Sequence, residues 1–225
     1  MPALLGLARA IDRFSSWLGI LIGGVTLLMI GVGLFNVFGR FADRYLGTAF
    51  SSNSLLELQW YLFSVIFLLG GAYVLSVDEH VRVDVLYGRL APKRRALINL
   101  LGTLLFLLPF CVIVLWVAIP WFQLSYGIQE SSSDPGGLLR WPIKLLLPIG
   151  FVLLFIQGVS EAIKAAGALS GHYEYRSQDE LDEVTALAAA VQLEGGQLDR
   201  AGLDGLLVGL PDEAEKQMND NQRKK

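Results

Sequence analysis

The chain has 225 residues, of which 53% are hydrophobic and 17% charged, and its mean hydropathy is +0.50. These proportions exclude an ordinary soluble domain, which carries more polar surface. Residues 1–169 hold twelve Lys/Arg against nine Asp/Glu (+3), whereas residues 170–225 hold six against twelve (−6). The sequence therefore predicts two parts, a membrane domain over 1–169 and an acidic tail over 170–225.

Four apolar runs fill the first part, at residues 17–38, 58–77, 96–122 and 143–163. Each reaches the roughly 20 residues that a helix needs to cross a bilayer. Because a backbone in lipid must satisfy its own polar groups, we expect four transmembrane helices in an all-α integral membrane protein. The first run is longer than the apolar region of a signal peptide, so we interpret it as a retained helix.

The distribution of Lys and Arg predicts the orientation of these helices. Of the thirteen Lys and Arg that flank the runs, nine lie before the first run, between the second and third runs, or shortly after the fourth, whereas four lie at the opposite ends of the runs. Since positive residues remain on the cytoplasmic side, both termini are expected in the cytoplasm. The outer connections would then be 39–56 and 123–142.

Polar residues mark the first outer connection. Ser54 and Glu57 have the spacing of a capping box, which would begin the second helix at Leu55. Alternatively, Glu57 pairs with Arg40 at the outer ends of the first two helices. Gln59 lies too deep for a cap, so we expect it to bond a neighbouring helix or subunit.

The second outer connection is a turn by composition and leads to Lys144 in the first turn of the last helix. The favoured interpretation is that Lys144 extends outward to the lipid headgroups, and the alternative is an ion pair with Glu130 or a partner carboxylate.

Three further features concern the helices themselves. The third run is the longest, and Pro109 at its centre predicts a bend. The glycines of the first two helices are interpreted as ordinary membrane-helix glycines, with a specific packing face as the alternative. Near the inner end of the last helix, Gln157, Glu161 and Lys164 share one face, which predicts a local ion pair between the last two.

Several classes of function find no support in the sequence. His80 and His172 lie outside the apolar runs, and Cys111 is the single cysteine, so a haem ligand at membrane depth and a cysteine-based metal site are not expected. We find no nucleotide-binding loop, no metalloprotease motif and no acidic residue central to a span. We therefore predict no enzyme activity, no cofactor and no nucleic-acid partner. The chain alone is not expected to move a substrate.

Four segments together resemble the small permease subunit, DctQ-like, of tripartite ATP-independent periplasmic (TRAP) transporters. The most specific is the string His-Val-Arg-Val-Asp after the second run. The segments are Asn36–Arg40, Glu57–Phe63, His80–Asp84, and Glu130-Ser131 with Pro135–Gly137.

This resemblance implies a scaffold subunit in a bacterial inner membrane, with a large permease subunit and a periplasmic solute-binding protein as partners. It further implies Na⁺-coupled uptake of organic acids, with Na⁺ binding in the large subunit. The acidic tail departs from the family pattern, and its composition predicts a partly helical or disordered segment in the cytoplasm. The competing hypothesis is the membrane anchor of an oxidoreductase.

Overall fold

The computed structural model describes residues 2–47, 50–77 and 92–171. Over these ranges the chain is helical apart from short connections and one isolated bridge, and four of its helical passages are long and apolar enough to cross a membrane, as predicted. The predicted acidic tail and the His80–Asp84 string lie outside the described residues. The elements are α1 (Pro2–Leu46), α2 (Asn53–Ser76), α4 (Pro92–Gly102), the π-helix η1 (Thr103–Leu107), α5 (Leu108–Gly127) and α6 (Trp141–Leu169).

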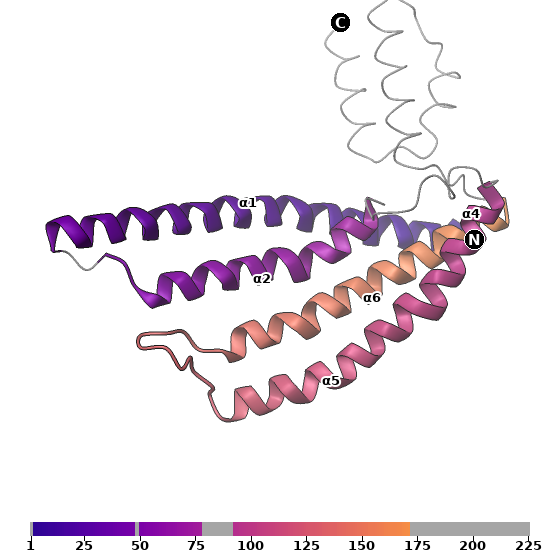
Figure 1. Cartoon of the computed structure of the whole chain (residues 1–225). Coiled ribbons are helices and arrows are strands. Elements are labelled where there is room, and N and C mark those ends of the chain that lie inside the picture. The colour runs from indigo at the N-terminus through magenta and orange to yellow at the C-terminus, as the bar shows by residue number, and fades with distance from the viewer. Residues whose placement is uncertain (1, 48–49, 78–91, 172–225) are drawn as a thin grey trace, which may run out of the picture.

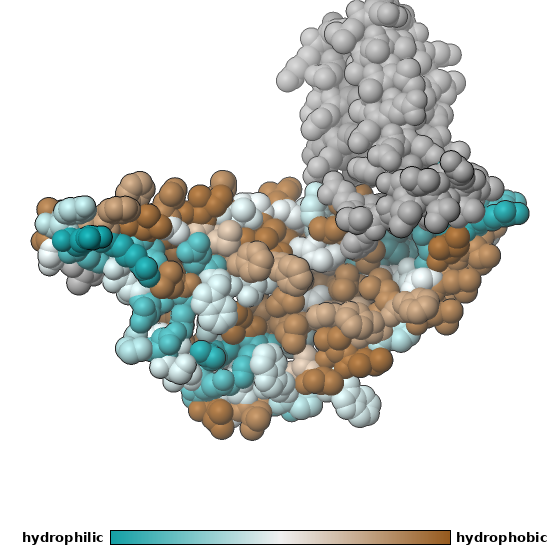
Figure 2. Space-filling view, in the orientation of Figure 1, coloured by the Kyte–Doolittle hydropathy of each residue, from teal (hydrophilic) through white to brown (hydrophobic). Residues whose placement is uncertain are grey.

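The helices lie side by side in an open layer rather than in a closed bundle. Figure 1 shows the order α1, α2, α6, α5 across this layer, and α6 packs against α1, α2, α4 and α5. Apolar residues cover the middle of the molecule, while polar residues gather at the end where α1 meets α2 (Figure 2). Large side chains such as Trp116 and Phe67 are 80% and 70% exposed. The layer therefore presents apolar surface that lipid or another protein must cover.

The first helix extends well beyond its apolar run of 17–38. With 45 residues, α1 is about 68 Å long, more than twice the thickness of a hydrocarbon core. It ends where Gly47 takes φ +65°, a conformation that suits glycine, and donates its N–H to the Asp43 carbonyl at 3.2 Å. The expectation that the third run forms the longest helix was wrong, because the charged residues that flank 17–38 continue the helix.

The third passage is irregular at its centre, next to the predicted bend at Pro109. The Leu108 N–H bonds the Thr103 carbonyl, five residues back, so the chain passes through one π-helical segment before α5 begins. A proline has no N–H to give to the preceding turn, and a wider turn just before it accommodates that loss. The helix bows at this level in Figure 1.

Only some glycines bring helices close together. A Cβ on Gly150 of α6 would lie 2.7 Å from the Leu68 carbonyl oxygen of α2, and one on Gly19 would lie 2.6 Å from the Tyr73 ring. By contrast, Gly23 and Gly71 have nothing within 4 Å. The packing-face alternative therefore holds at Gly19, whereas Gly23 and Gly71 behave as ordinary membrane-helix glycines.

We expect Gly150→Ala to lower the thermal stability of the protein in detergent, because its methyl group would collide with the α2 backbone. Overpacking of this kind costs about 1–3 kcal/mol. Gly71→Ala is the matched control and should be neutral or slightly stabilising, since alanine favours a helix. Equal midpoints of thermal unfolding for the two variants would contradict the close approach of α2 and α6.

Candidate functional site

The connection between α5 and α6, residues 128–140, folds as a hairpin at the end of the layer where α1 meets α2. Ser132 donates its N–H to the Leu138 carbonyl at 2.9 Å, and Arg140 donates to the Glu130 carbonyl at 2.8 Å. Gly136 takes φ +73° at the turn. The connections at this end, 47–52 and 128–140, are shorter than the predicted 39–56 and 123–142 because the helices extend into them.

Glu57 holds this hairpin against the start of α2. Its carboxylate is buried, at 3% exposure for the residue, and accepts hydrogen bonds from the Ser132 hydroxyl and the Leu138 N–H. The Ser54 hydroxyl donates to the Gly136 carbonyl of the same hairpin. These bonds join residues about 80 positions apart in the chain, so α2 and the hairpin form one unit.

The capping box predicted at Ser54 and Glu57 is therefore wrong. The N-cap of α2 is Ser52, whose hydroxyl accepts from the Leu55 N–H at 3.3 Å. Glu57 does not return to the cap because the hairpin supplies it with two better-placed donors. Helix starts are decided by such long-range bonds as much as by local sequence.

The alternative prediction, an ion pair between Glu57 and Arg40, is also wrong: both residues are described, and they do not pair with each other. Arg40 lies exposed near the end of α1, and the arginine whose charge acts on Glu57 is Arg140. Gln59 does contact a neighbouring helix: a Cβ on Gly33 of α1 would lie 2.9 Å from its Nε2. Gly33 thus makes room for the Gln59 side chain.

Glu130 and Lys144 form the ion pair that the sequence left as the alternative to extension into the headgroups. The Ser125 hydroxyl also donates to Glu130 at 2.7 Å, and Lys144 Nζ lies 4.4 Å from the centroid of the Trp121 ring. The hydrogen bonds from Lys144 and then Ser125 hold the pKa of the Glu130 carboxyl below its ordinary value. The hairpin is therefore tied to α5 and α6 as well as to α2.

A second group of polar residues, the α1–α6 polar cluster, joins α1 to α6 near the other end of the layer. The predicted ion pair between Lys164 and Glu161 is present at 2.5 Å, and Lys164 also binds Asp12 of α1 at 3.1 Å. Gln157 is fully buried, accepts from the Ser15 hydroxyl and donates to Asp12, each at 2.7 Å. The cluster consists of Asp12, Ser15, Gln157, Ser160, Glu161 and Lys164.

Sequence reasoning missed the α1 half of this cluster. Asp12 and Ser15 precede the apolar run of 17–38, so the span predicted from that run does not include them. A signal was present, because polar residues at 157, 160, 161 and 164 form a stripe on one face of an apolar helix. Such a stripe faces the protein interior and needs a polar partner, and positions 12 and 15 offer one at matching helical spacing.

Neither group has the composition of a reaction centre. Among the described residues, no three His, Cys, Asp or Glu side chains come together as a metal site would require. The buried carboxylates are bonded to hydroxyl, amide or ammonium donors within the chain. Within the part of the chain that the structure describes, three buried side-chain atoms have no hydrogen-bond partner, namely Oδ1 of Asn36, Nε of Arg140 and Nε1 of Trp141. Chemically, the two groups fasten helices and a loop to one another.

We expect Glu57→Gln to loosen the hairpin, since an amide offers one acceptor oxygen in place of two and points an N–H₂ at a donor. The midpoint of thermal unfolding should fall by roughly 3 °C or more. In a double-mutant cycle, Glu57→Gln and Ser132→Ala should be strongly coupled, whereas Glu57→Gln and Arg40→Gln should be additive. Strong coupling between Glu57→Gln and Arg40→Gln would instead support the ion pair of Glu57 with Arg40 and contradict the structure.

The Glu130 ion pair should make stability depend on pH. A carboxyl whose folded pKa is lowered stabilises the protein above its unfolded pKa of about 4.3, and this contribution is lost as the pH falls through the folded value. Wild type should therefore be more stable than Glu130→Gln at pH 7, and the difference should shrink below about pH 4. Asp134→Asn, which removes an exposed carboxylate of the same hairpin, is the control. A difference between wild type and Glu130→Gln that stays constant down to pH 3 would contradict the expectation.

Comparison with known proteins agrees with this architecture. A family model described as "Tripartite ATP-independent periplasmic transporters, DctQ component" matches residues 29–167. The C4-dicarboxylate TRAP transporter small permease protein DctQ of Pseudomonas aeruginosa is 30% identical over 150 residues, which cover 65% of this chain and 63% of that relative. The chain thus matches less than two thirds of the relative's length. No solved structure matches the chain. With a family match over most of its four-helix domain, the chain belongs to the DctQ component family of TRAP transporters, as a multi-pass inner-membrane transporter subunit and not an enzyme.

Proposed function

We propose that this chain is the scaffold subunit of a TRAP importer, which braces a large permease subunit in the membrane while a periplasmic solute-binding protein delivers the substrate. The open layer is the observation that carries this proposal. In three of the four spans, only 6% of the apolar 18-residue stretch is buried within the chain. Most of the surface of these spans is therefore available to lipid or to a partner. A four-helix protein that worked alone would bury more of itself.

The polar groups support the same role. One group lies towards each end of the layer, and the residues of each group bind other residues of the same group. Helix α6 contributes to both groups. The strongly bound carboxylates Glu57 and Glu161 have partners within the chain, which leaves them unsuited to take up and release a substrate or an ion. Substrate and coupling ion therefore bind elsewhere in the proposed complex, in the large subunit.

The substrate class rests on the family alone. The relative from Pseudomonas aeruginosa is named for C4-dicarboxylates, and we propose organic acids as the broader class for this chain, with Na⁺ as the coupling ion. The solute-binding protein would select among them. No observation on the described residues favours the competing hypothesis of an oxidoreductase anchor. The family match favours a transporter subunit instead.

We further propose that both termini are cytoplasmic, so that the hairpin at 128–140 faces the periplasm. Reporter fusions at Ser170 and Ser52 test this orientation, because the charge count places the first inside and the second outside. If a reporter that works only in the periplasm is active when fused at Ser170, the orientation is the reverse of the one proposed.

Deleting the chain should abolish uptake of the organic acid in cells that retain the large permease subunit and the binding protein. The reason is mechanical, since the large subunit would lack the layer that supports it. Re-expression of the wild-type chain should restore uptake, and the large subunit should co-purify with it. Uptake at the normal rate without this chain, with the large subunit present in the membrane, would end the scaffold proposal.

A further inference from the structure

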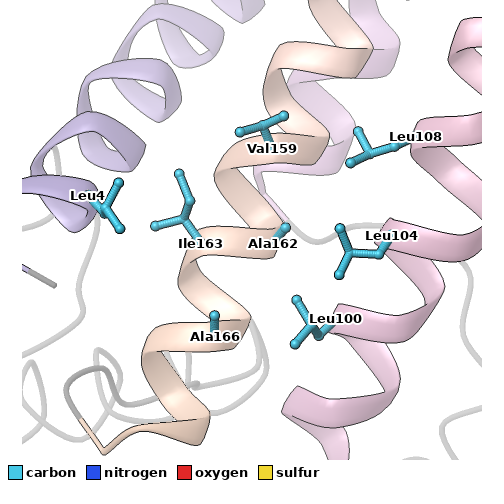
Figure 3. Close-up of a pocket in the computed structure, with 8 residues that line it drawn as sticks. All are labelled: Leu4, Leu100, Leu104, Leu108, Val159, Ala162, Ile163 and Ala166. Carbon is cyan, nitrogen blue, oxygen red and sulfur yellow. The ribbon is translucent and has the colours of Figure 1, made fainter.

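An open apolar groove lies between α6 and the passage formed by α4, η1 and the start of α5, towards the end of the layer where α4 begins (Figure 3). Its volume is about 320 Å³, and the side chains that line it are all aliphatic. The wall on α6 combines Ala162 and Ala166 with the larger Val159 and Ile163, and the opposite wall consists of leucines. The residues that shape it are Leu100, Leu104, Leu108, Ala162, Ala166 and, at its edge, Leu4 of α1.

The groove exists because α6 has two different faces at this level. Gln157, Glu161 and Lys164 turn towards α1, and the alanines at 162 and 166 lie on the opposite side of the helix. Because alanine leaves no side chain beyond Cβ, α6 does not fill the space beneath the leucines. An occupant must therefore be apolar where it contacts the groove, since the walls offer no polar partner.

The mouth of the groove is positively charged. Lys93 precedes Leu100 by seven residues, so it lies two helical turns away on the same face of α4, about 10 Å along the axis. Lys93 and its neighbour Arg94 are exposed. The described carboxylates at this end, Asp12 and Glu161, are both bound to Lys164 on the far side of α6 and do not neutralise them.

The basic residues at the mouth separate two kinds of apolar occupant, a side chain of a partner protein and the acyl chain of a lipid. An acyl chain is narrow and flexible enough to follow the aliphatic walls of the groove. Basic residues beside a pocket between membrane helices also suit an anionic headgroup.

We propose that this groove binds one acyl chain of an anionic phospholipid, with the phosphate of the headgroup held by Lys93 and Arg94. The site goes beyond the proposed transport function and does not depend on it. The apolar walls supply affinity for the acyl chain. The two cations supply preference for negative charge.

Native mass spectrometry of the full chain in mild detergent tests the headgroup contact. The protein is titrated with dioleoyl phosphatidylglycerol or with dioleoyl phosphatidylcholine, and the apparent Kd of the first bound lipid is measured. Wild type should prefer the anionic lipid by at least about tenfold. The double variant Lys93→Gln/Arg94→Gln should lose this preference and bind phosphatidylcholine as before, which also shows that it is folded. An unchanged preference would overturn the proposal.

A second pair of variants tests the groove itself. Ala162→Phe fills it and should weaken the binding of both lipids by about tenfold or more, and Ala166→Leu serves the same purpose if the first variant unfolds. The control is Val152→Phe in the other apolar groove, of about 370 Å³ between α5 and α6, which should leave phosphatidylglycerol binding unchanged.

Two outcomes of this comparison would overturn the site. Equal effects of Ala162→Phe and Val152→Phe would mean that lipid adheres to the apolar surface in general. If Ala162→Phe leaves lipid binding intact but prevents co-purification with the large permease subunit, the groove receives a protein and not a lipid. Because lipid binding is measured on this chain alone, a negative result leaves the uptake experiment unaffected.

Discussion

The position of α6 is the constraint on which the rest of the structure depends. Between helices in lipid, apolar side chains gain little by leaving the solvent, so close packing and buried polar bonds must hold the helices together. Three such attachments involve α6. Gly150 lets it approach the backbone of α2, Lys164 binds it to Asp12 of α1, and Lys144 binds it to the hairpin through Glu130.

This arrangement explains why polar residues lie towards the ends of the layer and apolar surface in the middle. At the ends, the hairpin and the α1–α6 polar cluster fix the relative heights and rotations of the helices, because their hydrogen bonds have preferred lengths and directions. In the middle, the helices need only fit one another, and their outer sides remain apolar. A layer fixed at both ends and apolar on its flanks suits the role of a brace for a larger partner.

The sequence predicted the helical passages well because an apolar run of about 20 residues has few alternatives in a bilayer. It predicted the ion pair of Glu161 with Lys164 because three residues along a helix bring side chains together. It could not predict that Ser54 would bind Gly136, or that Glu57 would receive the Leu138 N–H, since those partners are about 80 residues away. The extent of α1 was missed for the same reason, because its first turns are held by α6.

The place of α6 at the centre of the layer also bears on the order in which the protein assembles. As the last described helix, it is the last of them to leave the ribosome, yet α1, α2, α4 and α5 all pack against it. The first two helices can pair as soon as they are inserted, whereas α4 and α5 must wait in the membrane for their main neighbour. Before Trp141 is synthesised, the described helices therefore lack the neighbour that joins α4 and α5 to α1 and α2, and the layer is complete only once α6 is inserted.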